Sequence, residues 1–326
     1  MAKTLDAIPN LVPLYAKAAA GSAKKRPNST EIKVDELVVK GVTVDADRDQ
    51  DFRDVVGAPK SEQAFFGHIH ALIMPIQMEL MAADDFPLPM MGLVHTENTY
   101  REISPVTLGG KVDIAVKVAA FRAHRSGTEV VLESTVTSST SGATLVEEQS
   151  VYLAKGVRLK DAEGFEEVQA QREAIKSGAE TIKREQFKVP FPTAQWKLAG
   201  NTGRKWAKVS GDWNPIHITS VSAKALGMPA AIAHGMYTAS RALAEAQVLP
   251  GQSYEFQISF GAPVVLPTTI NVALTHTGDG AGAAHNLTEG SSNIGRAVNI
   301  VAWDRKKKRP HLSLIHISEP TRLLSI

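Results

Sequence analysis

The sequence predicts an α+β fold in which one architecture is used twice. Residues 61–87 are largely apolar over a length that suits a buried helix. Four strand-like segments rich in β-branched residues follow this helix. A charged segment comes next, and the order of helix and then strands recurs after it. A helix followed by several strands predicts an antiparallel sheet packed against that helix.

In the first half, residues 31–44 alternate apolar and polar side chains, which predicts a strand before the long helix. The four strands after the helix are expected at residues 91–103, 110–127, 128–140 and 143–156. Gly, Ser and Thr between them suit the turns of antiparallel hairpins. We therefore assign residues 1–158 to a first domain.

Residues 159–190 are charged and lack an apolar periodicity, which predicts an exposed helix or connector at the domain boundary. In residues 191–311, a short helix is expected at residues 203–212 and a long helix from about His234. Three strands are expected after it, at residues 254–265, 268–277 and 295–304. The repeat is inferred from the order of the elements, because the two halves do not share an obvious run of identical residues.

The last segment has a different character. Residues 312–322, LSLIHISEPTR, resemble the translation of a sequencing-library adapter. We therefore expect residues 312–326 to be an assembly artefact and exclude them from the predicted fold, so the true C-terminus would be missing. The alternative is a natural tail with an apolar segment.

Composition excludes several classes of function. The formal net charge is +2, with 36 basic and 34 acidic residues, so no overall field favours nucleic acid or an anionic membrane. The absence of cysteine excludes disulfides, thiolate metal sites and cysteine nucleophiles. The most apolar segment, from Ala71, is interrupted by Pro75, Gln77 and Glu79, and the N-terminus lacks a continuous apolar signal core. A cytoplasmic protein is expected.

Residues 210–217, SGDWNPIH, combine an acid, an amide, a proline and a histidine. Pro215 prevents the preceding short helix from continuing, so the chain must bend between Asp212 and His217. Such a bend allows the carboxylate and the imidazole to face one cavity as a general acid/base couple. Asn214 could fix the bend or orient a ligand. Taken singly, Asp212 is better explained as a capping or turn residue, and His217 as a satisfied, partly buried histidine.

A second stretch, AIAHGM at residues 231–236, strengthens the catalytic interpretation. Gly235 lies where the long helix begins, so its N–H is an unpaired donor at the positive end of the helix dipole. Such a donor suits a developing oxyanion, and glycine permits close approach of a carbonyl group. Together with Asp212 and His217, it suits proton chemistry beside a thioester carbonyl, through an enolate-like state.

WAKVSGDWNPIH followed by AIAHGM resembles the signature of the MaoC-like, or (R)-specific enoyl-CoA hydratase, family of hot-dog folds. The resemblance implies a double hot-dog, each half a sheet wrapped around a long central helix. It also implies reversible hydration of trans-2-enoyl thioesters to (3R)-hydroxyacyl thioesters in fatty-acid metabolism, a hydro-lyase activity with no metal and no other cofactor. The substrate would be carried on coenzyme A or acyl carrier protein.

By the same resemblance, Asp212 and His217 form the catalytic pair and the Gly235 amide forms the oxyanion hole, with support from Asn214, Ser210 and His234. The chain departs from the family in having Trp206 where Tyr or Phe is usual. Some members carry a serine on the central helix beyond the glycine, and neither Thr238 nor Ser240 matches it securely. Which of the acid and the histidine donates or accepts the proton stays open.

The first half lacks this motif. His68 and His70 are two residues apart on the expected helix and so do not share a face, which argues against a metal or catalytic site there. The resemblance implies a non-catalytic first half that shapes the acyl tunnel, in a pseudo-dimer of hot-dogs that could itself form a homodimer. The alternatives are a non-catalytic acyl-thioester binding protein and a thioesterase on the same fold.

Overall fold

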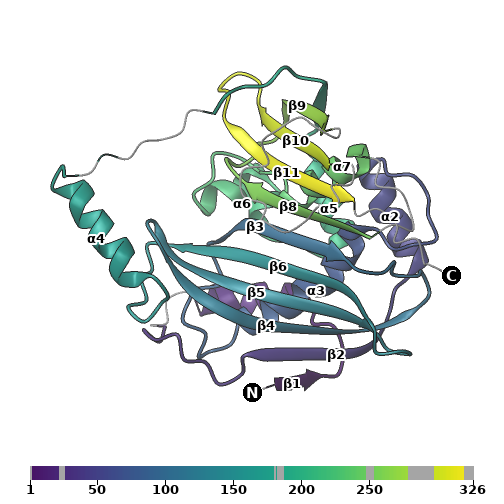
Figure 1. The fold of residues 1–326 in the computed structure, drawn as a ribbon, viewed down its shortest axis with the longest axis horizontal. Coiled ribbons are helices and arrows are strands. Elements are labelled where there is room, and N and C mark those ends of the chain that lie inside the picture. The colour runs from purple at the N-terminus through teal and green to yellow at the C-terminus, as the bar shows by residue number, and fades with distance from the viewer. Residues whose placement is uncertain are drawn as a thin grey trace.

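The computed structural model describes residues 2–21, 26–179, 181, 187–246, 253–277 and 297–318. Its strands form a single curved sheet, and helices of both halves lie against one face of that sheet (Figure 1). The strand order is β1-β2-β4-β5-β6-β3-β8-β11-β10-β9-β7. All neighbouring strands pair antiparallel except β1 and β2, which are parallel.

The strands of the first half are β1 Ala2–Leu5, β2 Glu36–Thr43, β3 Leu93–Glu102, β4 Lys111–His124, β5 Gly127–Ser138 and β6 Thr144–Lys155. Those of the second half are β7 Ala194–Leu198, β8 Tyr254–Phe260, β9 Thr268–Thr277, β10 Ala297–Asp304 and β11 Pro310–Ser318. The helices are α1 Leu11–Ala20, α2 Ala46–Val56, α3 Phe66–Met81, α4 Phe165–Lys176, α5 Thr202–Ser210, the 3₁₀ helix η1 Pro215–His217, α6 Ser220–Ala225 and α7 Gly235–Ala246.

The repeat inferred from the sequence is visible in the strand order. Inward from the edge strand β1, the first half runs β2-β4-β5-β6-β3, and from its own outer edge the second half runs β7-β9-β10-β11-β8. The two halves meet where β3 pairs with β8, from Glu97↔Ser259 to Glu102↔Tyr254. Apart from the edge strand β1, each half therefore contributes five strands and one central helix, α3 or α7, to a pseudo-symmetric unit.

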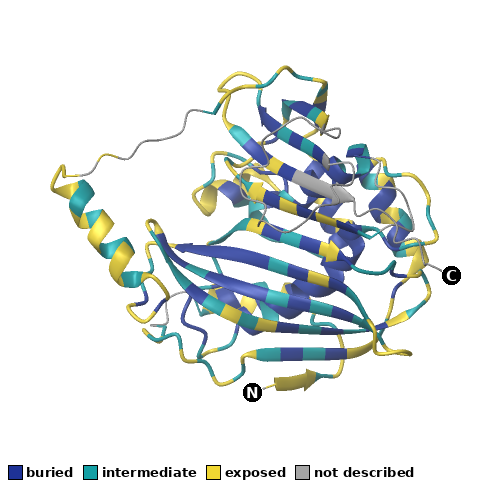
Figure 2. Ribbon diagram, viewed as in Figure 1, coloured by how far each residue is buried: buried dark blue, intermediate teal, exposed yellow. Residues whose placement is uncertain are grey.

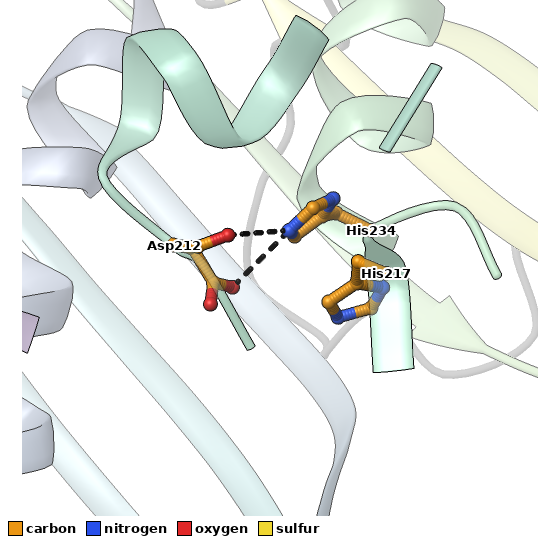
Figure 3. Close-up of side chains that lie close together, drawn as sticks. All are labelled: Asp212, His217 and His234. Carbon is orange, nitrogen blue, oxygen red and sulfur yellow. Dashed lines mark hydrogen bonds and ion pairs between the residues drawn. The ribbon is translucent and has the colours of Figure 1, made fainter. Parts of the chain in front are cut away.

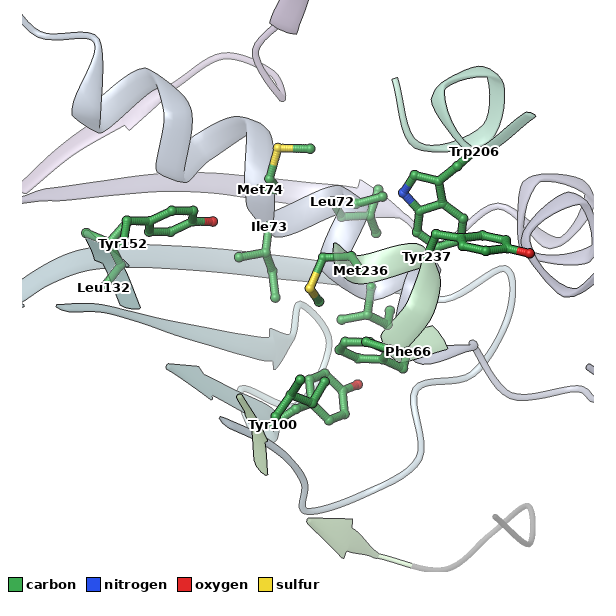
Figure 4. Packing of buried hydrophobic residues seen from close by; sticks show 14 of the residues in the cluster. Phe66, Leu72, Ile73, Met74, Tyr100, Leu132, Tyr152, Trp206, Met236 and Tyr237 are labelled. Atoms are coloured by element: carbon green, nitrogen blue, oxygen red, sulfur yellow. The ribbon is translucent and has the colours of Figure 1, made fainter. Parts of the chain in front are cut away.

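Both central helices are buried, and together they form one core. Nearly every residue of α3 is buried, as the apolar run predicted. Gly67 of α3 packs against α7 so closely that a Cβ there would lie 2.7 Å from Ser240 Oγ and 3.0 Å from Trp206 Cη2. In Figure 4, side chains of both halves, including Phe66 and Met236, lie in this shared cluster. The halves are thus not independent globules.

The charged segment between the halves contains α4, of which no residue is buried. Figure 2 shows this helix exposed or half-exposed along its length. This agrees with the exposed helix expected within residues 159–190. Across the described residues, no helix has the length and apolar character needed to cross a membrane.

The structure differs from the expected fold at the C-terminal boundary. Residues 310–318 form β11, which pairs with β10 on one side and β8 on the other. Leu312 and Leu314 are fully buried, because the alternation of apolar and polar residues in this segment matches the two faces of the sheet. The second hot-dog unit therefore extends past residue 311. The adapter origin of residues 312–326 stays a prediction, and residues 319–326 lie outside the described part.

Several elements were not expected from the sequence: β1, α1, α2, β7, η1 and α6. The helix α2 has clear signals at both ends, since the Asp45 side chain accepts a hydrogen bond from Arg48 N and Gly57 ends the helix at φ 77°. Its mean hydropathy is low, so no apolar run marks it, and only its packing against α3, α5 and α7 identifies its buried side.

Candidate active site

The bend predicted between Asp212 and His217 is present. Helix α5 ends at Gly211, whose φ of 78° places it in the left-handed region and whose N–H donates to Ala207 O. The chain then turns into η1, with Pro215 at its first position. This confirms that the helix cannot run through Asp212 to His217.

Hydrogen bonds within the turn hold its shape. Ser210 Oγ donates to Trp206 O at 2.9 Å and accepts from Asp212 N at 3.2 Å. Asn214 N donates to Asp212 Oδ1 at 3.1 Å, and Asn214 Oδ1 accepts from Ile216 N at 3.3 Å. The two residues expected to support the pair, Ser210 and Asn214, therefore shape the main chain around Asp212.

The orientation of the His217 ring assigns its tautomer. His217 Nδ1 lies 2.9 Å from the main-chain oxygen of Ile232, which can only accept a hydrogen bond. Nδ1 therefore carries the proton in the neutral ring, and Nε2 keeps its lone pair. This places the basic nitrogen of His217 on the side away from Ile232.

His234 completes the cluster of polar side chains. Its ring stacks on that of His217, with centroids 3.7 Å apart and an interplanar angle of 24°. His234 Nε2 donates to Asp212 O at 3.0 Å and lies 3.5 Å from Asp212 Oδ2 (Figure 3). The structure thus brings Asp212, His217 and His234 together from two separate stretches of the chain.

Gly235 is the first residue of α7, as predicted. No acceptor of its N–H occurs among the described residues, as expected for the first turn of a helix. A Cβ at this position would lie 3.0 Å from Cε1 of Phe260. A side chain at position 235 would therefore crowd the Phe260 ring at the start of α7, and the Gly235 amide is a donor next to His234 in the chain.

Tyr15 joins the site from the other half of the chain and was not predicted. Its hydroxyl donates to Asp212 Oδ1 at 2.6 Å, across 197 residues of sequence. Tyr15 lies on α1, whose apolar side packs against α3. No local sequence signal marks it, because a tyrosine in an apolar helix is an ordinary packing residue.

Burial and hydrogen bonding set the ionisation of these groups. Burial lowers the pKa of His217 and lowers that of His234 to about 3, so both rings are neutral at pH 7. Burial alone would raise the pKa of Asp212, but the nearby histidines, the Tyr15 hydroxyl and the Asn214 amide outweigh it, and the pKa lies below its ordinary value. At neutral pH the site therefore holds a carboxylate beside two neutral imidazoles.

Asp212, His217 and His234 each offer a ligand atom, and these atoms lie within 4.8 Å of one another. The His234 ligand atom is not free for a metal ion, because His234 Nε2 donates to Asp212 O. Asp212 Oδ2 and His217 Nε2 hold no such hydrogen bond among the described residues. The expectation that no metal is needed stays a prediction.

Trp206 forms the aromatic wall expected from the motif. It is 2% exposed and packs edge-on against Tyr237 and Phe52, with centroids 5.8 and 5.3 Å away. Figure 4 shows Trp206 beside Tyr237. Thr238 Oγ1 donates to Gly235 O at 2.6 Å, whereas Ser240 Oγ is buried without a partner among the described residues. Thr238 is therefore the hydroxyl residue that contacts the start of α7.

The histidines of the first half have structural partners. His68 Nδ1 lies 3.2 Å from Asp49 Oδ1, and His70 Nδ1 lies 2.9 Å from Glu148 Oε1. The two side chains contact different elements, as their spacing on the helix predicted. They lie inside the core rather than beside Asp212.

A pocket lies where the start of α3 meets the end of α7. Because α3 and α7 are the corresponding helices of the repeat, this pocket is the first half's counterpart of the site at the start of α7. Its lining includes Phe66, Glu102, Leu243 and Tyr254. None of the residues predicted to form the catalytic site lines it. Glu102 is buried there, and burial raises the pKa of its carboxyl to about 7.

The chain is similar to known proteins over most of its length. The family described as MaoC like domain matches residues 183–295. The chain is 28% identical over 264 residues to 3-hydroxyacyl-thioester dehydratase X from Mycobacterium tuberculosis, an alignment that covers 81% of this chain and 88% of that protein.

Solved structures are similar over most of the chain. The crystal structure of HtdX from Mycobacterium tuberculosis matches with a TM-score of 0.65 and 25% identity, covering 86% of this chain and 98% of that one. A MaoC-like dehydratase from Phytophthora capsici matches with a TM-score of 0.63 and 17% identity, covering 87% and 95%, and shows the fold alone. Residues 183–295 therefore match the MaoC like domain and contain Asp212, His217, His234 and Gly235, and the chain has the double hot-dog fold of the similar structures.

Proposed function

We propose that the protein is a hydro-lyase that reversibly hydrates trans-2-enoyl thioesters to (3R)-hydroxyacyl thioesters in fatty-acid metabolism. The observation that carries the proposal is the meeting of Asp212, His217 and His234 around one site, with Gly235 following His234 as the first residue of α7. The similarity to a protein named 3-hydroxyacyl-thioester dehydratase X, over most of both chains, supports the same reaction class.

The tautomer of His217 suggests which residue accepts the proton from water. Its Nε2 lone pair can take a proton from water as the water oxygen attacks Cβ of the enoyl group. The thioester oxygen then gains negative charge, which the Gly235 N–H at the positive end of α7 would stabilise. Protonation of Cα by the resulting imidazolium completes the addition of water and restores neutral His217.

Asp212 is ionised at neutral pH, so it does not carry a proton ready for Cα. Its role in this scheme is to hold the attacking water and to offset the positive charge that develops on His217. The sequence left open which of Asp212 and His217 delivers the proton, and in this scheme His217 does. Asp212 Oδ2 is the oxygen with room to hold the water, because Oδ1 already accepts from Tyr15 and Asn214.

The test uses the full chain, because truncation at residue 311 would remove most of β11. Loss of enoyl absorbance is followed with a short and a medium trans-2-enoyl-CoA, with chiral analysis of the product. Asp212→Asn and His217→Ala are measured beside His124→Ala, a histidine in the β4–β5 hairpin. Formation of the (3R) product, lost in the first two variants and kept in the third, is expected.

Other outcomes distinguish the alternatives. Release of free thiol without hydration would make the protein a thioesterase. Tight binding of acyl-CoA by a folded protein that turns over neither coenzyme A nor acyl carrier protein thioesters would make it a binding protein. Faster turnover of the acyl carrier protein thioester than of the coenzyme A thioester would identify the carrier.

A further inference from the structure

Tyr15 is the described residue of the first half with a direct hydrogen bond to Asp212. It lies at the middle of α1, a helix whose start is fixed by Asn10, the side chain of which accepts from Val12 N. Leu14 and Ala18 on the same helix are buried against the core. The position of the Tyr15 hydroxyl is therefore set by packing in the first half, whereas Asp212 belongs to the second.

The hydrogen bonds of Asp212 differ between its two oxygens. Oδ1 accepts from the Tyr15 hydroxyl at 2.6 Å and from Asn214 N at 3.1 Å. Oδ2 lies 3.5 Å from His234 Nε2, a longer and weaker contact. The carboxylate is thus held through one oxygen, and this leaves the other on the side of the two histidines.

Four titratable groups surround Asp212: Tyr15 from α1, Tyr152 from β6, His217 from η1 and His234 before α7. Burial and the Asp212 carboxylate raise the pKa of Tyr15 well above its ordinary value, so its hydroxyl stays a donor throughout the working pH range. His234 is neutral there. The Tyr15 hydroxyl and the Asn214 amide are therefore the donors that persist at neutral pH and keep Asp212 ionised.

We propose that Tyr15 is a positioning residue for Asp212: its hydroxyl fixes Oδ1 and turns Oδ2 toward His217 and His234. The inference rests on the proposed hydratase function for its kinetic consequence. The energetic coupling between Tyr15 and Asp212 that the inference requires can be measured without substrate.

Tyr15→Phe removes the hydroxyl and keeps the ring. The expected result is a fall in kcat of about tenfold near neutral pH, the order of a hydrogen bond to a charged group, with little change in KM. The acid limb of the pH profile of kcat should move to higher pH, because Asp212 without this donor is protonated more easily. A residue that only packs would lower the amount of folded enzyme without moving the limb.

The matched control is Tyr100→Phe. Tyr100 is also a buried tyrosine whose hydroxyl donates to a carboxylate, Glu102 Oε2 at 3.3 Å. This variant should keep the wild-type pH profile. An unmoved acid limb and unchanged kcat in Tyr15→Phe, or an equal shift in both variants, would overturn the proposal.

A double-mutant cycle separates the inference from the proposed function. Unfolding by urea is measured for Tyr15→Phe, Asp212→Asn and the double variant, and the effects of the two substitutions should be non-additive. Tyr100→Phe combined with Asp212→Asn should be additive. If the cycle shows coupling while the wild type has no hydratase activity, only the proposed function fails. If the enzyme is active and the Tyr15 cycle is additive, the positioning role fails.

Discussion

Gly203 of α5 packs directly against the carbonyl group of His217. A Cβ at position 203 would overlap His217 O and lie 3.0 Å from the carbonyl carbon. The backbone of α5 therefore sets the distance of η1 from the helix that precedes Asp212. The geometry of the Asp212 and His217 pair depends on this contact between two main-chain segments.

Gly203→Ala should therefore displace η1. The expected result is a loss of about 1–3 kcal/mol in the free energy of unfolding, from overpacking against a main-chain atom, and a marked fall in kcat. Gly200→Ala is the matched control, because nothing lies within 4 Å of a Cβ there. Urea unfolding and enoyl-CoA kinetics of both variants test this, and equal behaviour would contradict it.

His234 should make the protein sensitive to acid. Burial, together with His217, lowers the pKa of His234 from 6.5 to about 3. Between pH 6.5 and pH 3 the unfolded chain therefore binds a proton at His234 that the folded protein does not bind. Stability is then lost as pH falls from 6.5 toward 3, by up to about 1.4 kcal/mol per unit.

His234→Gln can retain a donor to Asp212 O and has no such titration. Its free energy of unfolding should fall less than that of the wild type between pH 6.5 and pH 3, measured by urea titration at several pH values. His124→Gln, a substitution of a less buried histidine, serves as control. Parallel curves for His234→Gln and the wild type would show that His234 is not buried neutral.

Glu102 should make the protein less stable as the pH rises, which is the opposite of the effect of His234. Burial raises the pKa of Glu102 from 4.5 to about 7, so the folded protein keeps a proton that the unfolded chain has released. Its stabilising contribution is complete below pH 4.5 and is lost as pH rises through 7, by about 3 kcal/mol in all. Glu102→Gln should be more stable than the wild type above pH 7 and similar to it below pH 4.5. Glu147→Gln, whose parent side chain is 54% exposed, should show neither effect in the same unfolding series.

β11 can be tested by two neighbouring substitutions. Leu314 is fully buried between β8 and β10, whereas Ser313 is exposed. Leu314→Ala should cost about 2–5 kcal/mol of unfolding free energy, and Ser313→Ala should stay within about 0.5 kcal/mol. Thermal and urea unfolding of both variants measure these changes in the free energy of unfolding. Two variants indistinguishable from the wild type would mean that this segment does not form an inner strand.

The sequence predicted the strands β2 to β6 and β8 to β10 because their alternation of apolar and polar residues is a local property. It predicted α3 and the start of α7 from a long apolar run and from a glycine after His234. It did not predict β1, β7 or η1, which are short, and β11 was set aside for its resemblance to an adapter. Short elements carry little periodicity, so only their partners in the sheet identify them.

At the candidate active site, too, the sequence determined the local features and the tertiary structure determined the rest. Pro215 and the residues beside it determined the bend between Asp212 and His217, because a proline and its neighbours restrict the chain locally. The stacking of His217 on His234, the tautomer of His217 and the hydrogen bond from Tyr15 to Asp212 were decided only by tertiary structure. Each joins residues separated in sequence, and its geometry follows from how α1, α3, α5 and α7 pack in one shared core, which no local pattern encodes.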